Sequence, residues 1–406
     1  MSLFVYKCSE CEAEYERDSV RYLCPECGKA TKPGQPLRGV LEAKFDFAKI
    51  RSRFDSRRPD WSLLCAVERE FHPPFPVGNT PFFRALRLGN EIGYANLFVK
   101  NDGLNPTGSL KDRASALMVA EASRLGERTV VAASTGNAGV ALAAACAAAG
   151  KEAIIFAPAA APKAKLIQML VHGARVIRVR GTYDDAYRLS LEFASRRSGL
   201  NRNTGYHPLT IEGKKTVALE IFEQNGMRAP DAIVIPVGDG VILSAVYRGF
   251  RDLQGLGLID KLPRLIAVQS ESSDAIHHFV QTGHYRNAAS PSTIADSISV
   301  SAPSTAILAR RTILDSDGFS VLVSDDDIRE AQVLLARTTG IFAEPAAAAT
   351  LAGLRKIPDG SLSKSNTVIL LITGHGLKNP ETVASLLVTP DPIESTWTAV
   401  EEALAS

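Results

Sequence analysis

Short runs of apolar residues, many of them β-branched or small, alternate with longer mixed segments over most of the chain. Runs bounded by Gly, Pro or Asn are typical of buried strands, and apolar positions at helical spacing are typical of amphipathic helices. We therefore expect strands at 97–100, 129–133, 153–157, 175–179, 232–237, 265–269, 320–323 and 367–372, with 320–323 at a sheet edge. Helices are expected at 109–125, 137–149, 162–172, 183–195, 212–224, 241–253, 325–337 and 345–354.

This alternation of strands and helices predicts an α/β fold. Strand–helix–strand units connect with a right-handed crossover and build parallel sheets that helices cover on both faces. The run 232–237 has no polar residue, as expected of a strand buried on both faces. In such sheets, ligands bind where loops leave the carboxyl ends of the strands.

The N-terminal segment carries two pairs of cysteines. Cys8 and Cys11 form one C-x2-C pair, Cys24 and Cys27 form the other, and twelve residues separate the pairs. Four thiolates at this spacing suit a closed tetrahedral zinc site, which is structural because no coordination position stays open for water. The alternative is four free thiols in a flexible tail. We predict a small zinc ribbon over residues 1–37.

The composition is that of an ordinary soluble protein. Hydrophobic residues make up 45% of the 406 residues and charged residues 22%, and the formal net charge is +2. This balance gives no reason to expect nucleic acid or a membrane surface as a partner. No apolar run approaches the ~18 residues of a membrane span, and the N-terminus lacks the basic and apolar blocks of a secretory signal. We expect a cytoplasmic protein.

Four loops carry residues suited to chemistry. Lys111 follows a Gly-Ser turn within 105–113, Asn-Pro-Thr-Gly-Ser-Leu-Lys-Asp-Arg. The other loops are Ser-Thr-Gly-Asn at 134–137, Gly-Asp-Gly-Val-Ile at 238–242 and Thr-Gly-His-Gly-Leu-Lys at 373–378. Amides at a helix N-terminus bind anions, and the helix dipole there disfavours an ammonium, which helps a lysine act as a base. Taken alone, each loop also has a plain interpretation: a solvated lysine, an ordinary helix cap or a turn without a ligand.

The string around Lys111 resembles the lysine motif of fold-type II pyridoxal-phosphate (PLP) enzymes, the tryptophan synthase β-like family, with Leu110 in place of the usual phenylalanine. The string 373–378 is similar to a motif of threonine synthases. With the cysteine pairs in front, nearly the whole chain resembles threonine synthases that carry a zinc-binding segment. The resemblance implies two doubly wound parallel-sheet domains behind the ribbon: a large PLP-binding domain of 38–135 and 227–406, and a small α/β domain of 136–226.

The resemblance also implies roles for the site residues. Lys111 forms the Schiff base with PLP and serves as the catalytic base, and Thr373 places its hydroxyl near the pyridine nitrogen. Asn137 reaches the ring hydroxyl of the cofactor. The substrate carboxylate is expected at Ser134, Thr135 and Asn137. The cofactor phosphate is expected at Gly238, Asp239, Gly240, Val241 and Ile242.

Three positions leave alternatives open. Asp239 stands where relatives usually have asparagine, so its carboxylate must turn away and present only its amide to a phosphate dianion. Glu344 precedes a proline as in relatives, and a site residue or a charge before a helix fits equally well. Arg113 or nearby lysines are candidates for holding a substrate phosphate.

By resemblance, the expected reaction converts O-phosphohomoserine and water to threonine and phosphate, and a homodimer is usual. One segment departs from this pattern. Threonine synthases tend to have an Ile-Arg-x-Gly string where this chain has 295–300, Ala-Asp-Ser-Ile-Ser-Val, which is more like threonine or serine dehydratases. An ammonia-lyase is therefore the alternative, followed by another β-replacing synthase. In a different class, the ribbon would be a docking or nucleic-acid module on inactive domains.

Overall fold

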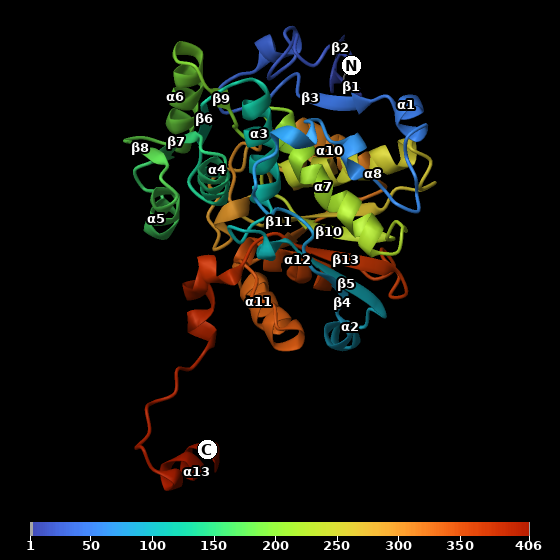
Figure 1. The fold of residues 1–406 in the computed structure, drawn as a ribbon. Helices are drawn as coiled ribbons and strands as arrows, with labels where there is room; N and C mark the ends of the chain where they lie inside the picture. The colour runs from blue at the N-terminus through green and yellow to red at the C-terminus, as the bar shows by residue number, and fades with distance from the viewer. Residues whose placement is uncertain (1–2, 406) are drawn as a thin grey trace.

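The computed structural model describes residues 3–405, within which the strands form three sheets. The largest sheet has six strands in the order β12-β11-β10-β13-β5-β4, and β4 alone runs antiparallel to its neighbour (Figure 1). The strand at 319–323 lies at the edge, as predicted. The six are β4 (Phe82–Arg84), β5 (Asn96–Asn101), β10 (Ala232–Pro236), β11 (Arg264–Ser270), β12 (Phe319–Val323) and β13 (Thr367–Ile372).

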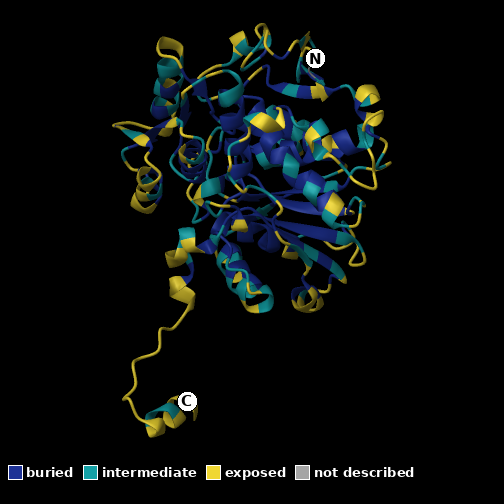
Figure 2. Cartoon of the chain, in the orientation of Figure 1, coloured by how far each residue is buried: buried dark blue, intermediate teal, exposed yellow. Residues whose placement is uncertain are grey.

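Helices cover both faces of this large sheet. Successive side chains along a strand point to opposite faces, and here both sets are apolar and buried. Ile233 and Ile235 point into the cluster that contains α8 and α10, whereas Val234 points into the cluster that contains α12. The buried strands form the dark centre of Figure 2. These helices are α8 (Val241–Gly255), α10 (Ala306–Asp315) and α12 (Pro345–Arg355).

A second sheet has four parallel strands in the order β8-β7-β6-β9. Helix α6 packs on one face through Phe193 and Ala186, and α4, which is almost fully buried, contacts β6 and β7. Its strands are β6 (Thr129–Ala133), β7 (Glu152–Pro158), β8 (Arg175–Val179) and β9 (Leu200–Asn201). Its helices are α4 (Asn137–Ala148), α5 (Lys163–Val171) and α6 (Tyr183–Arg196).

The N-terminal segment forms a third sheet, which is antiparallel, in the order β2-β1-β3. It contains β1 (Phe4–Cys8), β2 (Glu14–Tyr15) and β3 (Leu41–Phe45), so it extends past the predicted end at residue 37. The segment is tied to the rest of the protein: Arg17 pairs with Glu121 of α3 (Lys111–Arg124) at 3.0 Å, and Arg311 of α10 pairs with Glu42 at 2.5 Å. It is therefore a docked layer.

The expected α/β class with parallel sheets is confirmed. The division into domains stays a prediction. The sheets follow it in outline, but β6, which was assigned to the large domain, pairs with β7 in the four-stranded sheet.

None of the helices within residues 3–405 combines the length and apolarity needed to cross a membrane. The remaining helices are α1 (Phe47–Arg51), α2 (Leu86–Ile92), α9 (Ala275–Thr282), α11 (Asp325–Thr339) and the exposed α13 (Trp397–Ala405), which lies away from the body (Figures 1 and 2).

Helix α3 (Lys111–Arg124) lies between the two parallel sheets. It packs against α4 on the small-sheet side and against α7 (Leu209–Gln224), which in turn packs against α8. Burial on both sides explains why α3 has almost no exposed residue. Its first residue is Lys111, so the candidate cofactor lysine lies where the two sheets meet.

A buried cluster of charges fixes this junction. The guanidinium of Arg113 donates to Asp102 at 2.6 Å and to Glu220 of α7 at 2.6 Å, and Lys100 of β5 donates to the other oxygen of Glu220 at 2.6 Å. Burial alone would raise the pKa of Glu220, but the hydrogen bond and charge of Arg113, with help from Lys100, lower it to about 2. The carboxylate is therefore held ionised.

A pH-dependent stability follows from Glu220. Its folded-state pKa lies below the ordinary value of 4.5, so its contribution is present above about pH 4.5 and is lost as the pH falls towards 2. We expect Glu220→Gln to lower the free energy of unfolding at neutral pH by about 3 kcal/mol and to flatten its decline below about pH 4.5. Urea denaturation at several pH values measures both effects. The exposed Glu91→Gln is the control, and equal slopes in both variants would contradict the assignment.

Candidate active site

The strand order reverses at one point in each parallel sheet. In the large sheet this point lies between β10 and β13, and in the small sheet between β6 and β9. At such a point, the loops that follow two neighbouring strands lead away in opposite directions and leave a crevice between them. Ligands usually bind in this crevice. Gly238 follows β10, Thr373 follows β13, Ser134 follows β6 and Arg202 follows β9. Three of the four predicted motifs therefore sit at these reversal points, and the fourth begins α3 between them.

The loop of Lys111 is paired with the loop of Thr373. The amide of Leu110 donates to the Thr373 carbonyl at 3.0 Å, and the amide of His375 donates to the Gly108 carbonyl at 3.0 Å. Asp112 is buried and accepts from the amide and hydroxyl of Thr107 at 2.8 and 2.6 Å. These bonds hold the backbone on both sides of Lys111 and bring two predicted motifs together.

The Lys111 amine has no hydrogen-bond or ion-pair partner among residues 3–405. Burial lowers its pKa, the charge of Glu344 opposes this effect, and the charge of Lys165 adds to it. A desolvated amine with a depressed pKa is neutral over a wider pH range. It can therefore act as a nucleophile or as a base near neutral pH.

Glu344 is the centre of the polar site. It is fully buried, and its two oxygens accept from Nδ2 of Asn137 at 3.0 and 2.9 Å. Ser297 donates to the same carboxylate at 3.2 Å, and the ammonium of Lys165 lies 3.8 Å away. The sequence left Glu344 open between a site residue and a helix-flanking charge, and the structure places it in the site. Because Nδ2 is occupied, the buried Oδ1 of Asn137 is left without a partner within residues 3–405.

The Ser134–Asn137 loop opens α4. The Ser134 hydroxyl accepts from the amides of Gly136 and Gly139 at 3.2 and 2.8 Å, so it caps the helix. A Cβ added at Gly136 would lie 3.3 Å from the side chain of Lys165, which places this lysine beside the loop. A helix N-terminus with a lysine next to it suits a carboxylate. The substrate roles of Ser134, Thr135 and Asn137 stay predictions.

The loop after β10 has the shape of a phosphate cup. Gly240 has φ +87, which favours glycine, and a Cβ on Gly238 would lie 3.0 Å from Cα of Ile298. No side chain caps α8, so its first amides, including those of Val241 and Ile242, stay available for an anion. The carboxylate of Asp239 accepts from the amide of Ser304 at 3.1 Å, as required if only its backbone faces a phosphate.

One of the side chains left open for a substrate phosphate is already occupied. Arg113 was a candidate for holding a substrate phosphate, but its guanidinium is fully engaged by Asp102, Glu220 and their neighbours. Lys165 was missed, since nothing but its place in the first turn of a helix marks it. It forms a close ion pair with Asp296 of the large-sheet domain, within the segment that departs from the threonine synthase pattern.

The four N-terminal cysteines converge. Their sulfur atoms all lie within 4.8 Å of one another, and the hydroxyl of Tyr15 lies 3.1 Å from the sulfur of Cys24. Gly39, with φ +67, passes so close that a Cβ would lie 2.9 Å from Cβ of Cys24 and Cys27. This arrangement fits a tetrahedral sulfur site.

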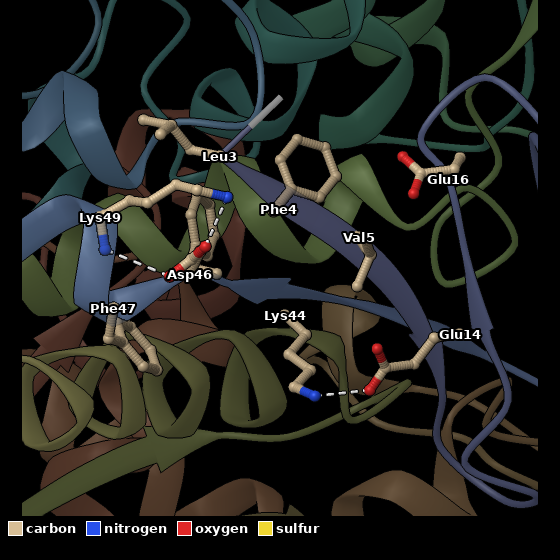
Figure 3. Close-up of a pocket in the computed structure, with 10 residues that line it drawn as sticks. Leu3, Phe4, Val5, Glu14, Glu16, Lys44, Asp46, Phe47 and Lys49 are labelled. Atoms are coloured by element: carbon tan, nitrogen blue, oxygen red, sulfur yellow. Dashed lines mark hydrogen bonds and ion pairs between the residues drawn. The ribbon is translucent and has the colours of Figure 1, made fainter. Parts of the chain in front are cut away.

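A hollow of about 680 Å³ lies on the same N-terminal layer (Figure 3). Four of its charged residues are paired with one another: Lys44 with Glu14 at 2.5 Å and Lys49 with Asp46 at 2.7 Å. None of the candidate site residues lines it. We assign it no role in the chemistry.

A half-buried amine without a partner, an uncapped helix N-terminus and a polar cluster at the strand reversal suit an enzyme of the PLP-dependent class, and the family described as "Pyridoxal-phosphate dependent enzyme" matches residues 74–374. Threonine synthase of Methanosarcina acetivorans is 37% identical over 99% of both chains, and that of Methanocaldococcus jannaschii is 34% identical over 96% of both. A fungal L-serine ammonia-lyase from Rhizomucor miehei superposes with a TM-score of 0.66 at 25% identity, covering 76% of this chain and 97% of its own. The chain belongs to the PLP-dependent enzymes and, within them, to the threonine synthase family.

The effect of Glu344 on Lys111 can be tested by substitution. Its negative charge raises the pKa of Lys111, so Glu344→Gln will lower that pKa further and release the Asn137 amide. We expect kcat to fall by at least about tenfold, and the pH at which kcat rises to move down by about one unit or more. Rates measured across pH check both effects. Glu381→Gln on the surface is the control, and a lowered rate without a shifted profile would assign Glu344 a structural role only.

Proposed function

We propose that this enzyme converts O-phosphohomoserine and water to threonine and phosphate. The observation that carries the proposal is similarity to threonine synthases over nearly the entire chain, including the cysteine-bearing N-terminal layer. The site is consistent with it, since it combines a neutral amine, an amide-lined cup and positive charge near the carboxylate loop. We further propose that the enzyme is a cytoplasmic homodimer that does not bind nucleic acid, with the domain division given above.

The residues present fit PLP. Lys111 would hold the cofactor through its amine, the amides at 238–242 would hold its phosphate, and the unpaired Oδ1 of Asn137 would accept from its ring hydroxyl. Bound PLP supplies an electron sink for charge that develops at the substrate Cα. Thr373, which is buried at the end of β13, offers a neutral hydroxyl to the pyridine nitrogen. A hydroxyl does not hold that nitrogen protonated as a carboxylate would.

The chain's own residues account for the proton transfers. The carboxylate of the amino acid binds at the N-terminus of α4, with Lys165 beside it, which orients Cα towards Lys111. The neutral amine of Lys111 removes the proton at Cα and returns one at the end of the cycle. Glu344 stabilises the ammonium that forms in between, because its charge has the largest raising effect on the pKa of Lys111.

An ammonia-lyase acting on threonine or serine is the second candidate. It is favoured by the segment 295–300, where threonine synthases tend to have an arginine. In the structure, Asp296 and Ser297 of this segment contact Lys165 and Glu344 instead. An acid and a hydroxyl at this place suit the elimination of a β-hydroxyl as well as the replacement of a γ-phosphate.

Product analysis separates these two candidates. With O-phosphohomoserine, we expect the purified holoenzyme to release phosphate and threonine in equal amounts. With threonine or serine alone, we expect no more than slow formation of keto acid and ammonia. Lys111→Ala should abolish phosphate release and the absorbance of the lysine-bound cofactor, because no other amine starts α3. Ammonia from threonine without any phosphate release from O-phosphohomoserine would overturn the proposed function.

We also propose that Cys8, Cys11, Cys24 and Cys27 bind one structural zinc ion. The convergence of the four sulfur atoms supports this proposal, and the docked sheet around them argues against a separate docking module. A closed site of this kind contributes to folding rather than to catalysis.

Zinc content and stability test the metal site. We expect about one zinc ion per chain. We expect the Cys27→Ser variant to bind no zinc and to have a lower melting temperature, because the ion no longer cross-links the loop beside Gly39. Elemental analysis and thermal denaturation measure both quantities. Cys65→Ser is the matched control outside the cluster. A metal-free wild-type protein that is as stable as the zinc-treated one would refute the site.

A further inference from the structure

Two buried cations near Lys111 lack an anionic partner. Lys214 of α7 is 2% exposed and Arg202 after β9 is 0% exposed. The Lys214 amine and Nε of Arg202 have no hydrogen-bond partner within residues 3–405, and neither residue forms an ion pair there. Burying an unpaired charge is costly, so such a group usually marks a site where something is bound.

The fold places both cations beside the start of α3. Helix α7 approaches α3 so closely at Gly213 that a Cβ would lie 2.6 Å from the Arg113 carbonyl oxygen, and Lys214 is the next residue. The guanidinium of Arg202 reaches the hydroxyl of Ser115 at 3.4 Å. Ser115 is one helical turn from Lys111 on the same face of α3. The two cations come from different elements, and each interacts electrostatically with the Lys111 amine.

The neighbouring Lys215 shows that burial alone does not explain Lys214. Lys215 is equally buried, but its amine is paired with Glu212 at 2.6 Å and Asp252 at 2.8 Å. Lys100 and Lys165, the other fully buried lysines among the largest core side chains, are also paired with acids. Lys214 instead faces Arg202 and Lys111, with Asp239 as the one opposing charge. The carboxylate of Asp239 is already bonded to Ser304.

We propose that Lys214 and Arg202 form the subsite for the phosphate monoester group of the amino-acid substrate. The inference rests on the proposed function and names the residues that give it its preference for a phosphorylated substrate. Two flexible or forked cations suit a dianionic phosphate, to which they donate charge-assisted hydrogen bonds. The cofactor phosphate has its own place at the uncapped N-terminus of α8, whereas Arg202 belongs to the small sheet and contacts α3.

The pKa values of Lys214 and Arg202 are consistent with an anion that binds reversibly. Burial lowers the pKa of Lys214 well below its ordinary value, and the charges of Arg202 and Lys111 lower it further. Burial likewise lowers the pKa of Arg202 to about 10, against the raising effect of Tyr183, Asp112 and Cys146. A bound dianion would reverse these shifts. The subsite then becomes fully charged only when the substrate phosphate is present.

The test uses the holoenzyme and the variants Lys214→Gln and Arg202→Gln, with Lys163→Gln on the exposed face of α5 as a control for the lost charge. Three quantities are measured: the dissociation constant of inorganic phosphate by calorimetry, KM for O-phosphohomoserine, and the dissociation constant of PLP. We expect the first two to rise by about ten- to a hundredfold in both site variants, as for the loss of a charge-assisted hydrogen bond, with PLP binding unchanged. The control should match the wild type.

Thermal denaturation guards against misfolded variants. Lys214→Gln removes a buried amine that has no partner, so without phosphate its melting temperature should equal or exceed that of the wild type. The rise in melting temperature that phosphate gives the wild type should be lost. Phosphate binding unchanged in both variants would overturn the proposal. So would weaker PLP binding with unchanged phosphate binding, because the cations would then serve the cofactor.

Failure of the proposed function would look different. If the wild type binds phosphate through Lys214 and Arg202 but does not turn over O-phosphohomoserine, the subsite stands and belongs to another phosphorylated amino acid. If the wild-type holoenzyme does not bind phosphate at all, the subsite is refuted, whatever substrate it turns over.

Discussion

The buried ion pairs of Arg113 fix where the chemistry can occur. Arg113 lies two residues after Lys111, and its guanidinium joins Asp102, at the end of β5, to Glu220 on α7. Charges buried this deeply are tolerated only when every partner is in place, so small displacements of α3 are costly. The network therefore locks the start of α3 between the two sheets. The pairing of the Lys111 and Thr373 loops, and the approach of α7 at Gly213, depend on that position.

Pairing, rather than burial, divides the lysines in and around the site into two groups. Lys100, Lys165 and Lys215 are all buried, and each is neutralised by an acid within 2.8 Å. Lys111 and Lys214 have no such partner among the described residues, and burial lowers the pKa of both. The low dielectric of the interior strengthens the interaction between paired charges. It also shifts the pKa of an unpaired group, which makes that group reactive or able to bind a ligand. An enzyme that handles an anionic amino acid can use both kinds within one layer.

Much of the fold could be predicted because its signals are local. Strands at 129–133, 175–179 and 367–372 were predicted to the residue, since each is a short run rich in β-branched and other apolar residues with clear boundaries. The N-terminal sheet was not predicted, because β2 has two residues and β1 pairs with β3, which lies far away in the sequence. The motifs around Lys111 and Thr373 were found from their residue strings. Glu344 was left undecided, and Lys165 was missed, because their roles arise from contacts between elements distant in sequence.

The absence of an arginine in the segment 295–300 weighs less against a phosphorylated substrate once the charges are located. An arginine there would supply positive charge to the cleft, and in its place Asp296 supplies a negative charge that Lys165 neutralises. The positive charge that remains unpaired is on Arg202 and Lys214, which come from other elements and act on each other electrostatically. A cleft built for threonine or serine would offer these two side chains no phosphate besides that of the cofactor, which has its own place at 238–242, so their burial would stay uncompensated. The charge distribution therefore favours the phosphate-releasing reaction, although the segment itself is more like that of dehydratases.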